Sequence, residues 1–269
     1  MPEPVKMSFA GVEFDIVQDE AAPAYFVFGV RKSGSSIMNS MVTSLARFNQ
    51  VNYVDVAGQL FGKGVTVAGW QNDAGMATLL QGGNLFGGFR NAPLGLVGHP
   101  LLAASKKILL VRDPRDALVS EYFSSAYSHS IPEEGEGRQQ MLENRARALK
   151  ASVATYVLRQ AKSFRGTLME YREFIGMPGM RLYHYEDAIM NKRWFLEDIC
   201  EHFGWTVTDQ QLDQILGWAD VLPDEERPDK FVRKVTPGDH RDKLEAEVIL
   251  QLNDILAPML DELGYSPTT

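Results

Sequence analysis

Short continuous apolar runs alternate along the chain with longer segments in which apolar residues recur every three or four positions. Residues 24–30 (AYFVFGV) are apolar throughout, which is typical of a strand buried in a parallel sheet. Residues 35–48 then place apolar side chains on one face of a predicted helix, and residues 51–56 predict a second strand. The loop between the first strand and the helix therefore has the context that a phosphate-binding loop requires.

The rest of the chain continues this alternation. Residues 108–111 predict a buried strand, after which Asp113 is suited to cap a helix that has Pro114 at its first position. The further predicted elements are an acidic exposed loop at 130–140, helices at 141–164 and 166–175, a strand leading into a helix at 180–189, a helix at 194–205 that ends at Gly204, a basic loop at 228–244, and a helix at 245–265 interrupted at Pro258. Alternating strands and helices predict an α/β fold, with a parallel sheet covered on both faces, in a single domain over residues 1–269.

Residues 58–98 break the regularity, since 11 of these 41 residues are glycine and no clean period is visible. A glycine-rich segment this long inside a globular domain is usually functional or mobile. We therefore expect it to shape a ligand site together with the loop at 130–140.

Composition narrows the possible functions. The 269 residues carry a net charge of −8, from 27 basic and 35 acidic side chains, so bulk attraction to nucleic acid or to an anionic membrane is not expected. An anionic ligand must then be held by a local basic cluster. The one cysteine, Cys200, excludes an intrachain disulfide framework and a cysteine zinc site. With no signal-peptide core and no run of membrane-spanning length, the sequence predicts a soluble cytoplasmic protein.

The loop FGVRKSGSS, at residues 28–36, looks like a nucleoside triphosphate loop with a displaced lysine. Its two glycines have the separation of the pattern G-x-x-x-x-G-K-[ST], but Lys32 comes before the second glycine instead of after it. Backbone N–H groups that enter a helix bind anions, and Ser35 and Ser36 can add hydroxyl donors. The alternative is an ordinary serine cap beside a surface lysine.

Two further basic elements follow. Arg112 ends the strand in LLVRDPRDALVSEYF, and Ser120 lies eight residues later. An arginine at the carboxyl end of a parallel strand points into the ligand crevice and suits a bidentate phosphate contact, although pairing with Asp113 or Asp116 is the simpler explanation for it alone. The late segment FVRKVTPGDHR is basic, and by itself it reads as solvated surface.

Together the three elements resemble the PAPS-dependent sulfotransferase family, PAPS being 3′-phosphoadenosine 5′-phosphosulfate. RKSGSS is similar to the family's 5′-phosphosulfate loop, the arginine and serine of LLVRDPRDALVSEYF to its 3′-phosphate motif, and FVRKVTPGDHR to its late R-K-G…G-D-W loop. YHYEDAI resembles the strand end that brings a tyrosine near the adenine, and LAPMLDELGY resembles the tail of many bacterial members. The resemblance spans roughly residues 24–265, in the correct order.

The resemblance implies a P-loop-type three-layer α/β/α fold and transfer of a sulfuryl group from PAPS to a hydroxyl or amine of a small-molecule, lipid or carbohydrate acceptor, with PAP as the product. The residues implied for the 5′-phosphosulfate are Arg31, Lys32, Ser33, Gly34, Ser35 and Ser36. Those implied for the 3′-phosphate are Arg112, Ser120, Arg233 and Lys234, and Tyr185 is implied near the adenine.

Three positions depart from the family pattern. Ile37 stands where an adenine-stacking tryptophan is frequent, Val235 replaces a glycine of the late loop, and His240 stands where a tryptophan is common. The adenine is therefore expected to be held differently. The dimerisation motif of the animal cytosolic members is not visible, so the oligomeric state stays open.

Sulfuryl transfer is expected to proceed in line, like phosphoryl transfer, with negative charge building on the bridging oxygen of the leaving phosphate. The resemblance implies that Lys32 stabilises or protonates this oxygen. Because the lysine, a helix N-terminus and backbone donors can together hold that charge, we expect no metal requirement.

The base for the acceptor hydroxyl stays open at this point. His99 is one candidate, although a turn histidine beside Pro100 explains it nearly as well. Arg90 matches the family's spacing to the 3′-phosphate arginine better than His99 does, and there it would orient the sulfonyl group or an anionic acceptor. The other candidate bases are then Asp55, Glu121 and His129.

Two other interpretations are kept. In a P-loop kinase, KILLVRD would be the strand that ends in a magnesium-binding aspartate, Asp113, but the lysine is misplaced and Arg112 stands where an apolar residue is expected. In a binding module that has lost catalysis, Lys32 would not be needed at the leaving oxygen.

Overall fold

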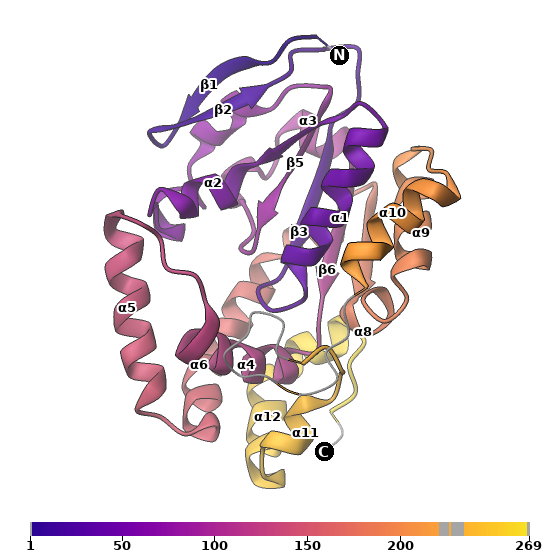
Figure 1. Ribbon diagram of the computed structural model, residues 1–269. Coiled ribbons are helices and arrows are strands. Elements are labelled where there is room, and N and C mark those ends of the chain that lie inside the picture. Colours follow the sequence, from indigo (N-terminus) through magenta and orange to yellow (C-terminus); the bar gives the residue numbers. More distant parts are fainter. Residues whose placement is uncertain (1, 221–225, 227–233, 268–269) are drawn as a thin grey trace.

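A five-stranded parallel sheet forms the centre of the molecule (Figure 1). The computed structural model describes residues 2–220, 226 and 234–267. Across the sheet the strands run in the order β4 (Asn52–Asp55), β5 (Asn84–Phe89), β3 (Tyr25–Gly29), β6 (Lys106–Val111) and β7 (Met180–His184). All neighbours pair in parallel, so the carboxyl ends of all five strands lie at one edge of the sheet.

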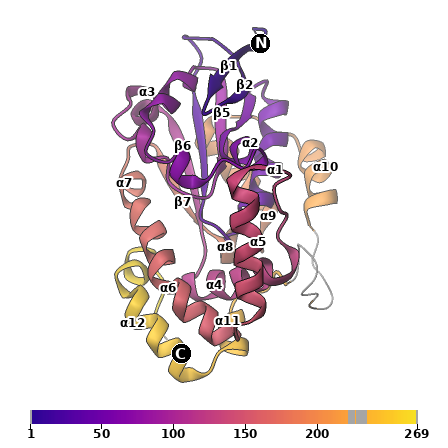
Figure 2. The same cartoon turned by 90° about the vertical axis from the view of Figure 1, so that its left-hand side faces the viewer.

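Helices cover both faces of this sheet, as Figures 1 and 2 show. Their bounds are α1 (Ser35–Phe48), α2 (Val56–Gly62), α3 (Pro100–Ala104), α4 (Pro114–Phe123), α5 (Gly135–Leu149), α6 (Val153–Glu170), α7 (Arg172–Ile175), α8 (Tyr185–Ala188), α9 (Lys192–Phe203), α10 (Asp209–Ala219), α11 (Asp239–Lys243) and α12 (Ala246–Glu262). Short 3-10 segments are found at Val67–Gly69, Ala74–Leu79 and Leu94–Leu96, and a π-helical turn at Ser124–Ser128.

The two layers follow from the alternation of side chains along the strands. Tyr25 and Val27 of β3 pack with α1, α9 and α10 in one buried cluster. Phe26 and Phe28 of the same strand pack with α4, α6 and α12 in the other. Successive side chains of a strand point to opposite faces, so a fully apolar strand needs cover on both sides. The predicted three-layer α/β/α fold with a central parallel sheet is confirmed.

The glycine-rich segment contains strand β5, which was not predicted from the sequence. All six residues of β5 are buried, and the strand lies between β3 and β4. Two adjacent glycines break the apolar pattern in its second half. Gly88 has a φ of 82°, and a Cβ there would come within 1.9 Å of Asp55 Oδ1. Glycine has a low strand propensity, but because it lacks a Cβ the Asp55 carboxylate can approach the backbone here.

Other predicted boundaries were wrong in part. Residues 135–140 are not loop, because α5 begins at Gly135. Pro258 does not interrupt the last helix, since α12 continues through it to Glu262. Leu256, Met259 and Leu260 are fully buried on either side of this proline. Their packing offsets the one backbone hydrogen bond that proline removes.

A two-stranded antiparallel hairpin, β1 (Val5–Phe9) and β2 (Val12–Ile16), precedes the sheet and lies beside α2 in Figure 1. Phe14 and Ile16 of β2 belong to the same buried cluster as α2 and β5. Within the described part of the chain, no helix has both the length and the apolar character needed to cross a membrane.

Candidate functional site

The loop between β3 and α1 makes a tight turn at the carboxyl edge of the sheet. The backbone N–H and the hydroxyl of buried Ser33 both donate to the Val30 carbonyl, at 3.1 and 2.6 Å. Lys32 at the loop apex has a φ of 67°, and Gly34 has a φ of 82°. A non-glycine residue in the left-handed region is uncommon and clusters at ligand-binding turns. Ser35 and Ser36 begin α1, so the first helical N–H groups face the same edge.

Arg112 joins this loop to the neighbouring strand. Its side chain is buried at the end of β6, and Nη1 donates to the Lys32 carbonyl at 3.4 Å. The guanidinium stacks on the Tyr185 ring at 4.2 Å, and Nη2 lies 3.8 Å from Asp116. Arg112 Nε is buried without a hydrogen-bond partner. The structure therefore brings Lys32, Arg112 and Tyr185 together and leaves one buried donor available.

Tyr185 supports both the loop and the late segment of the chain. A Cβ on Gly34 would lie 3.1 Å from the Tyr185 ring, so only a glycine fits there without displacing the ring. The Tyr185 hydroxyl donates to the Val235 carbonyl at 2.7 Å. The ring thus links the phosphosulfate-loop candidate to the segment after residue 233.

Asp116 of α4 anchors the same late segment. Its carboxylate accepts from the backbone N–H groups of Gly238 and His240, at 2.6 and 2.9 Å, and pairs with His240 Nδ1 at 2.6 Å. Burial alone would raise the pKa of Asp116, but the hydrogen bonds from His240 and the charge of Arg112 lower it to about 2. An acid in such a donor-rich position stays ionised across the physiological range.

The other residues expected at the 3′-phosphate are Ser120, Lys234 and Arg233. Ser120 lies half-buried on α4, one helical turn beyond Asp116. Lys234 Nζ sits between Asp239 and Asp242, at 3.0 and 2.9 Å. Arg233 lies outside the described residues.

Arg31, the residue before Lys32, contacts α4 and α6. Its Nε lies 3.5 Å from the Glu121 carboxylate, and its guanidinium covers the Phe164 ring at 4.9 Å. Glu121 is thereby engaged in an ion pair, which makes it less suited than the other candidate acids to act as a base.

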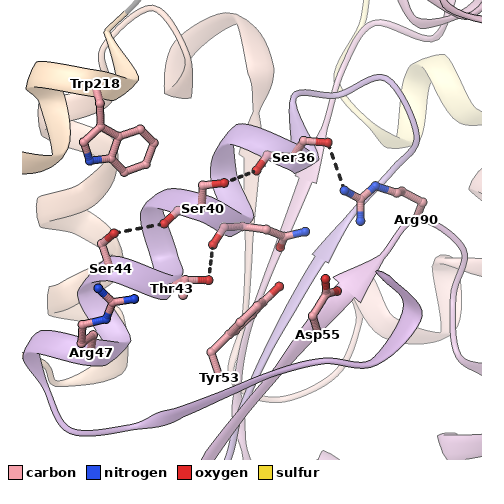
Figure 3. A pocket seen from close by; sticks show the side chains of 10 residues that line it. Ser36, Ser40, Thr43, Ser44, Arg47, Tyr53, Asp55, Arg90 and Trp218 are labelled. Carbon is pink, nitrogen blue, oxygen red and sulfur yellow. Dashed lines mark hydrogen bonds between the residues drawn. The ribbon is translucent and has the colours of Figure 1, made fainter. Parts of the chain in front are cut away.

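Arg90 extends the site from the end of β5. Its guanidinium donates to the Gly88 carbonyl through Nη1 and to Ser36 Oγ through Nη2, the latter at 3.1 Å. Figure 3 shows this contact at one end of a groove that follows α1. The groove has a volume of about 490 Å³. Its lining residues are Ser36, Asn39, Ser40, Thr43, Ser44, Arg47, Tyr53, Asp55, Arg90 and Trp218.

Asp55 is the last residue of β4 and lines this groove with Arg90. It caps α2 by accepting from Gly58 N–H at 3.1 Å. Burial raises the pKa of its carboxyl above the ordinary value, against the lowering effects of the Arg90 charge and of the Gly58 hydrogen bond. A half-buried carboxylate of this kind, at the edge where the other candidates meet, is suited to accept a proton.

The two histidine candidates lie at different places. His99 caps α3, accepting from Leu101 N–H through Nδ1 at 3.3 Å. Because α3 leads into the amino end of β6, His99 lies at the edge of the sheet opposite Lys32, and α3 lies far from the β3–α1 loop in Figure 1. The structure therefore does not bring His99 to the other candidates. His129, by contrast, is close enough to Lys32 and Arg90 for their charges to add to burial in lowering its pKa.

The groove along α1 was not predicted from the sequence. The helix period places Ser36, Ser40 and Ser44 on one polar stripe of the predicted helix, with Asn39 and Thr43 beside them. That stripe was available as a signal, but nothing in the pattern indicated that Tyr53 and Trp218 would flank it. Within the described ranges, no group of His, Cys, Asp and Glu side chains is arranged to hold a metal ion.

Comparison with solved structures finds proteins of similar fold. Mouse sulfotransferase SULT7A1 complexed with PAP has a similar fold, with a TM-score of 0.58 at 12% identity, covering 95% of this chain and 94% of that one. Retinol dehydratase in complex with androsterone and inactive cofactor PAP gives a TM-score of 0.50 at 15% identity, over 90% of this chain and 82% of that one. At such identities the likeness concerns the fold alone.

At the sequence level, none of the curated proteins compared with the chain gives a match. The family model of the sulfotransferase domain, however, matches residues 99–264, which is more than half of the chain. The matched region includes Arg112, Ser120 and Tyr185. The chain therefore belongs to the sulfotransferase family.

Proposed function

We propose that this sulfotransferase uses PAPS to sulfate a hydroxyl or amine of an acceptor, with PAP as the product. The observation that carries the proposal is the hydrogen bond from Arg112 to the Lys32 carbonyl. The cations that the family resemblance assigns to the 3′-phosphate and to the 5′-phosphosulfate thereby belong to one connected unit. A cofactor with charge at both ends would find both cations already in position.

The residues present fit such a cofactor. Arg112 Nε is a buried donor without a partner, which an anionic oxygen would satisfy. The first turn of α1 adds backbone N–H groups and the partial positive charge of the helix. We assign the 5′-phosphosulfate to the segment from Arg31 to Ser36 and the 3′-phosphate to Arg112 and Ser120, with Arg233 and Lys234 of the late segment added on the strength of the family resemblance.

When bound, PAPS supplies a sulfuryl group attached to a phosphate leaving group. Lys32 stabilises or protonates the oxygen that links phosphate and sulfur, an effect commonly worth about 10²–10³ in rate. Arg90, fixed by Ser36, orients the sulfonyl oxygens at the end of the groove. No metal is required in this scheme.

Asp55 is the base that the geometry favours, because it shares the groove with Arg90 and Ser36. It would accept the proton of the acceptor hydroxyl as the oxygen attacks sulfur. His129 is the second candidate, since burial and the charges of Lys32, Arg145 and Arg90 lower the pKa of its ring.

A thermal-shift comparison tests the proposal against a P-loop kinase. PAP at about one hundred times its Kd, without divalent metal, should raise Tm by roughly 5–10 °C. ADP with Mg²⁺ should raise it by much less. In the structure Asp113, the residue a kinase would use for Mg²⁺, is held by Arg115 through Nε at 3.0 Å and Nη2 at 2.7 Å. Stabilisation by ADP with Mg²⁺ alone would reject the sulfotransferase mechanism.

A further inference from the structure

We propose that the groove along α1 is the acceptor site and that it takes an anionic oligosaccharide. The inference rests on the proposed function and deepens it by naming the class of acceptor. It depends on four observations: the position of the groove, its polar lining, an unpaired buried oxygen, and the placement of two arginines and a tryptophan.

The groove begins where the sulfuryl group would be held. Ser36 is both the end of the RKSGSS loop and the first lining residue of the groove, and it receives the hydrogen bond from Arg90. Asp55 lines the same end. An acceptor lying in the groove would therefore place a hydroxyl between a base and the transferred group, as in-line attack demands.

The lining is polar throughout its length, which is unusual for a small-molecule site. Pockets for drug-like or steroid-like ligands are lined mainly by apolar and aromatic side chains with few polar groups. Here eight of the ten lining residues are hydroxyl, amide, carboxylate or guanidinium side chains, and the other two are Tyr53 and Trp218. Such a surface offers an apolar phenol or sterol little area to bury but offers a polyol many partners.

The unpaired Asn39 side chain favours a ligand with hydrogen-bond donors in the groove. Its side chain is only 9% exposed, and its Oδ1 atom is buried without a hydrogen-bond partner. The buried Tyr53 hydroxyl lies beside Thr43 in the same lining. Unpaired buried polar atoms cost about 1–3 kcal/mol each, so a complementary partner is strongly favoured. A phosphate or sulfate oxygen cannot donate to an amide oxygen, whereas a sugar hydroxyl can.

Arginines mark the two ends of the groove. Arg90 lies beside Ser36, and exposed Arg47 lies in the last turn of α1. The eleven helical steps from Ser36 to Arg47 span about 16 Å, which is longer than one sugar ring. Trp218 of α10 lies across α1 from Tyr53 and Asp55 (Figure 3), with 42% of its surface exposed. Its ring gives an apolar face for a sugar ring, and Arg47 gives a partner for a carboxylate or sulfate on that sugar.

The chain provides matched controls for both outer residues. Arg147 is exposed in the last turn of α5, as Arg47 is in α1, but it lies outside the groove. Trp194 on α9 is 41% exposed, almost the same as Trp218. The test therefore compares Arg47→Ala with Arg147→Ala, and Trp218→Ala with Trp194→Ala, all in the full chain saturated with PAP or PAPS.

The probes are a uronic-acid hexasaccharide, a neutral glucose hexasaccharide and 2-naphthol. Binding to the PAP complex is measured by calorimetry, and transfer is measured from ³⁵S-labelled PAPS. We expect the uronic-acid probe to bind most tightly and to be sulfated, the neutral one to bind more weakly, and 2-naphthol to be a poor acceptor. Trp218→Ala should weaken hexasaccharide binding about 5–50-fold. Arg47→Ala should weaken binding of the uronic-acid probe about 2–5-fold without affecting the neutral one.

Two failures are distinguishable. If PAP stabilises the protein but 2-naphthol is the better acceptor, or if Trp218→Ala behaves like Trp194→Ala, the oligosaccharide inference is wrong and the proposed function stands. If PAP gives no stabilisation, the proposed function itself fails. Asn39→Asp adds a third readout, because it keeps the size of the side chain but repels the uronic-acid probe more than the neutral one.

Discussion

The two halves of the site differ in which polar atoms are left unpaired. We define the cofactor half as Lys32, Arg112, Asp116, Tyr185 and His240, and the acceptor half as Ser36, Asn39, Tyr53, Asp55 and Arg90. In the first half the Nε atom of Arg112 is an unpaired donor, and His240 Nε2 is also unpaired there; in the second half the unpaired amide oxygen of Asn39 is an acceptor. Anionic oxygens satisfy only donors, whereas hydroxyl groups satisfy acceptors as well. The difference separates a surface suited to phosphate from one suited to a hydroxylated acceptor.

The halves also differ in how rigidly they are built. The cofactor half ties together three distant segments, since Asp116 and Tyr185 both hold the chain around residues 235–240. In the acceptor half, Arg90 and Asp55 are fixed by hydrogen bonds at one end, and the groove is open along α1. Apart from Lys32, whose proposed role is in the transfer step, we therefore expect substitutions in the cofactor half to change cofactor affinity and stability. Substitutions in the acceptor half should change acceptor kinetics.

The largest expected effect comes from Lys32→Ala, because Lys32 is the cation proposed to act on the leaving oxygen during transfer. Turnover should fall by at least about 10²–10³-fold, since charge on the leaving oxygen loses its cation. PAP affinity should stay within several-fold, because Arg112 and the helix N-terminus still hold the phosphates. Labelled-sulfate transfer and PAP titration measure the two quantities, with Lys6→Ala, a lysine of the distant β1–β2 hairpin, as the control. Turnover like that of the wild type in Lys32→Ala would remove the lysine from the mechanism.

The next prediction concerns Asp55→Asn, which keeps the cap on α2 but cannot accept a proton. We expect kcat to fall by roughly 10²–10⁴-fold. Because burial raises the pKa of Asp55, the wild-type rate should decline as pH falls towards a value above the ordinary one of an aspartate, and this acid limb should vanish in the variant.

Asp73→Asn is the matched control for Asp55, since Asp73 also caps a short helix, through Gly75 N–H at 2.8 Å. It should leave rate and pH profile unchanged. If the acid limb persists in Asp55→Asn and disappears in His129→Gln, His129 is the base instead. The proton acceptor would then lie outside the groove, because His129 is not one of the lining residues.

A smaller effect is expected for Arg112→Lys, which separates charge from geometry in the cofactor half. A lysine keeps the positive charge but loses the fork that reaches the Lys32 carbonyl and the stacking on Tyr185. PAP affinity should fall about 10–100-fold, with the acceptor KM nearly constant. Arg165→Lys, which replaces another arginine that donates to a backbone carbonyl, serves as the control in the same PAP titration. An equal loss in both variants would point to general destabilisation.

The sequence predicted much of the cofactor half because its residues lie in short contiguous motifs. The strand, loop and helix around Lys32 follow from local periodicity, and α1 has the predicted bounds of Ser35–Phe48. Arg112 could be placed at the carboxyl edge because a parallel sheet brings all strand ends to one side. The partnership of Asp116 with His240 could not be predicted, since those residues are 124 positions apart and only the folded chain joins them.

The acceptor half was predictable only in fragments. Asp55 and Arg90 were both named as candidates from the sequence, but their meeting depends on β5, which the glycines concealed. A strand interior is normally read from apolar residues, and Gly88 is present for the approach of Asp55 rather than for the strand. Tertiary demands of this kind override local propensity and cannot be seen in a single sequence.

The smallest expected effect is on stability, and it tests whether the cofactor half is held together by Asp116. Because the pKa of Asp116 in the folded protein is about 2, below the ordinary 3.8, the carboxylate contributes stability above about pH 4 and loses it as pH falls towards 2. The contribution is about 2 kcal/mol. Asp116→Asn should therefore be less stable than the wild type at pH 7, and the gap should close near pH 2.

Urea unfolding at several pH values measures this gap, with Asp242→Asn, an exposed partner of Lys234, as the control. A gap for Asp116→Asn that does not change with pH would mean that packing, not charge, fixes the late segment. PAP affinity should fall only a few-fold in Asp116→Asn, less than in Arg112→Lys, because Tyr185 still holds Val235. Since the hydrogen bonds of Asp116 go to the late segment and not to the lining of the groove, acceptor KM should not change. A changed KM would show that the two halves are coupled through the loop that carries Lys32.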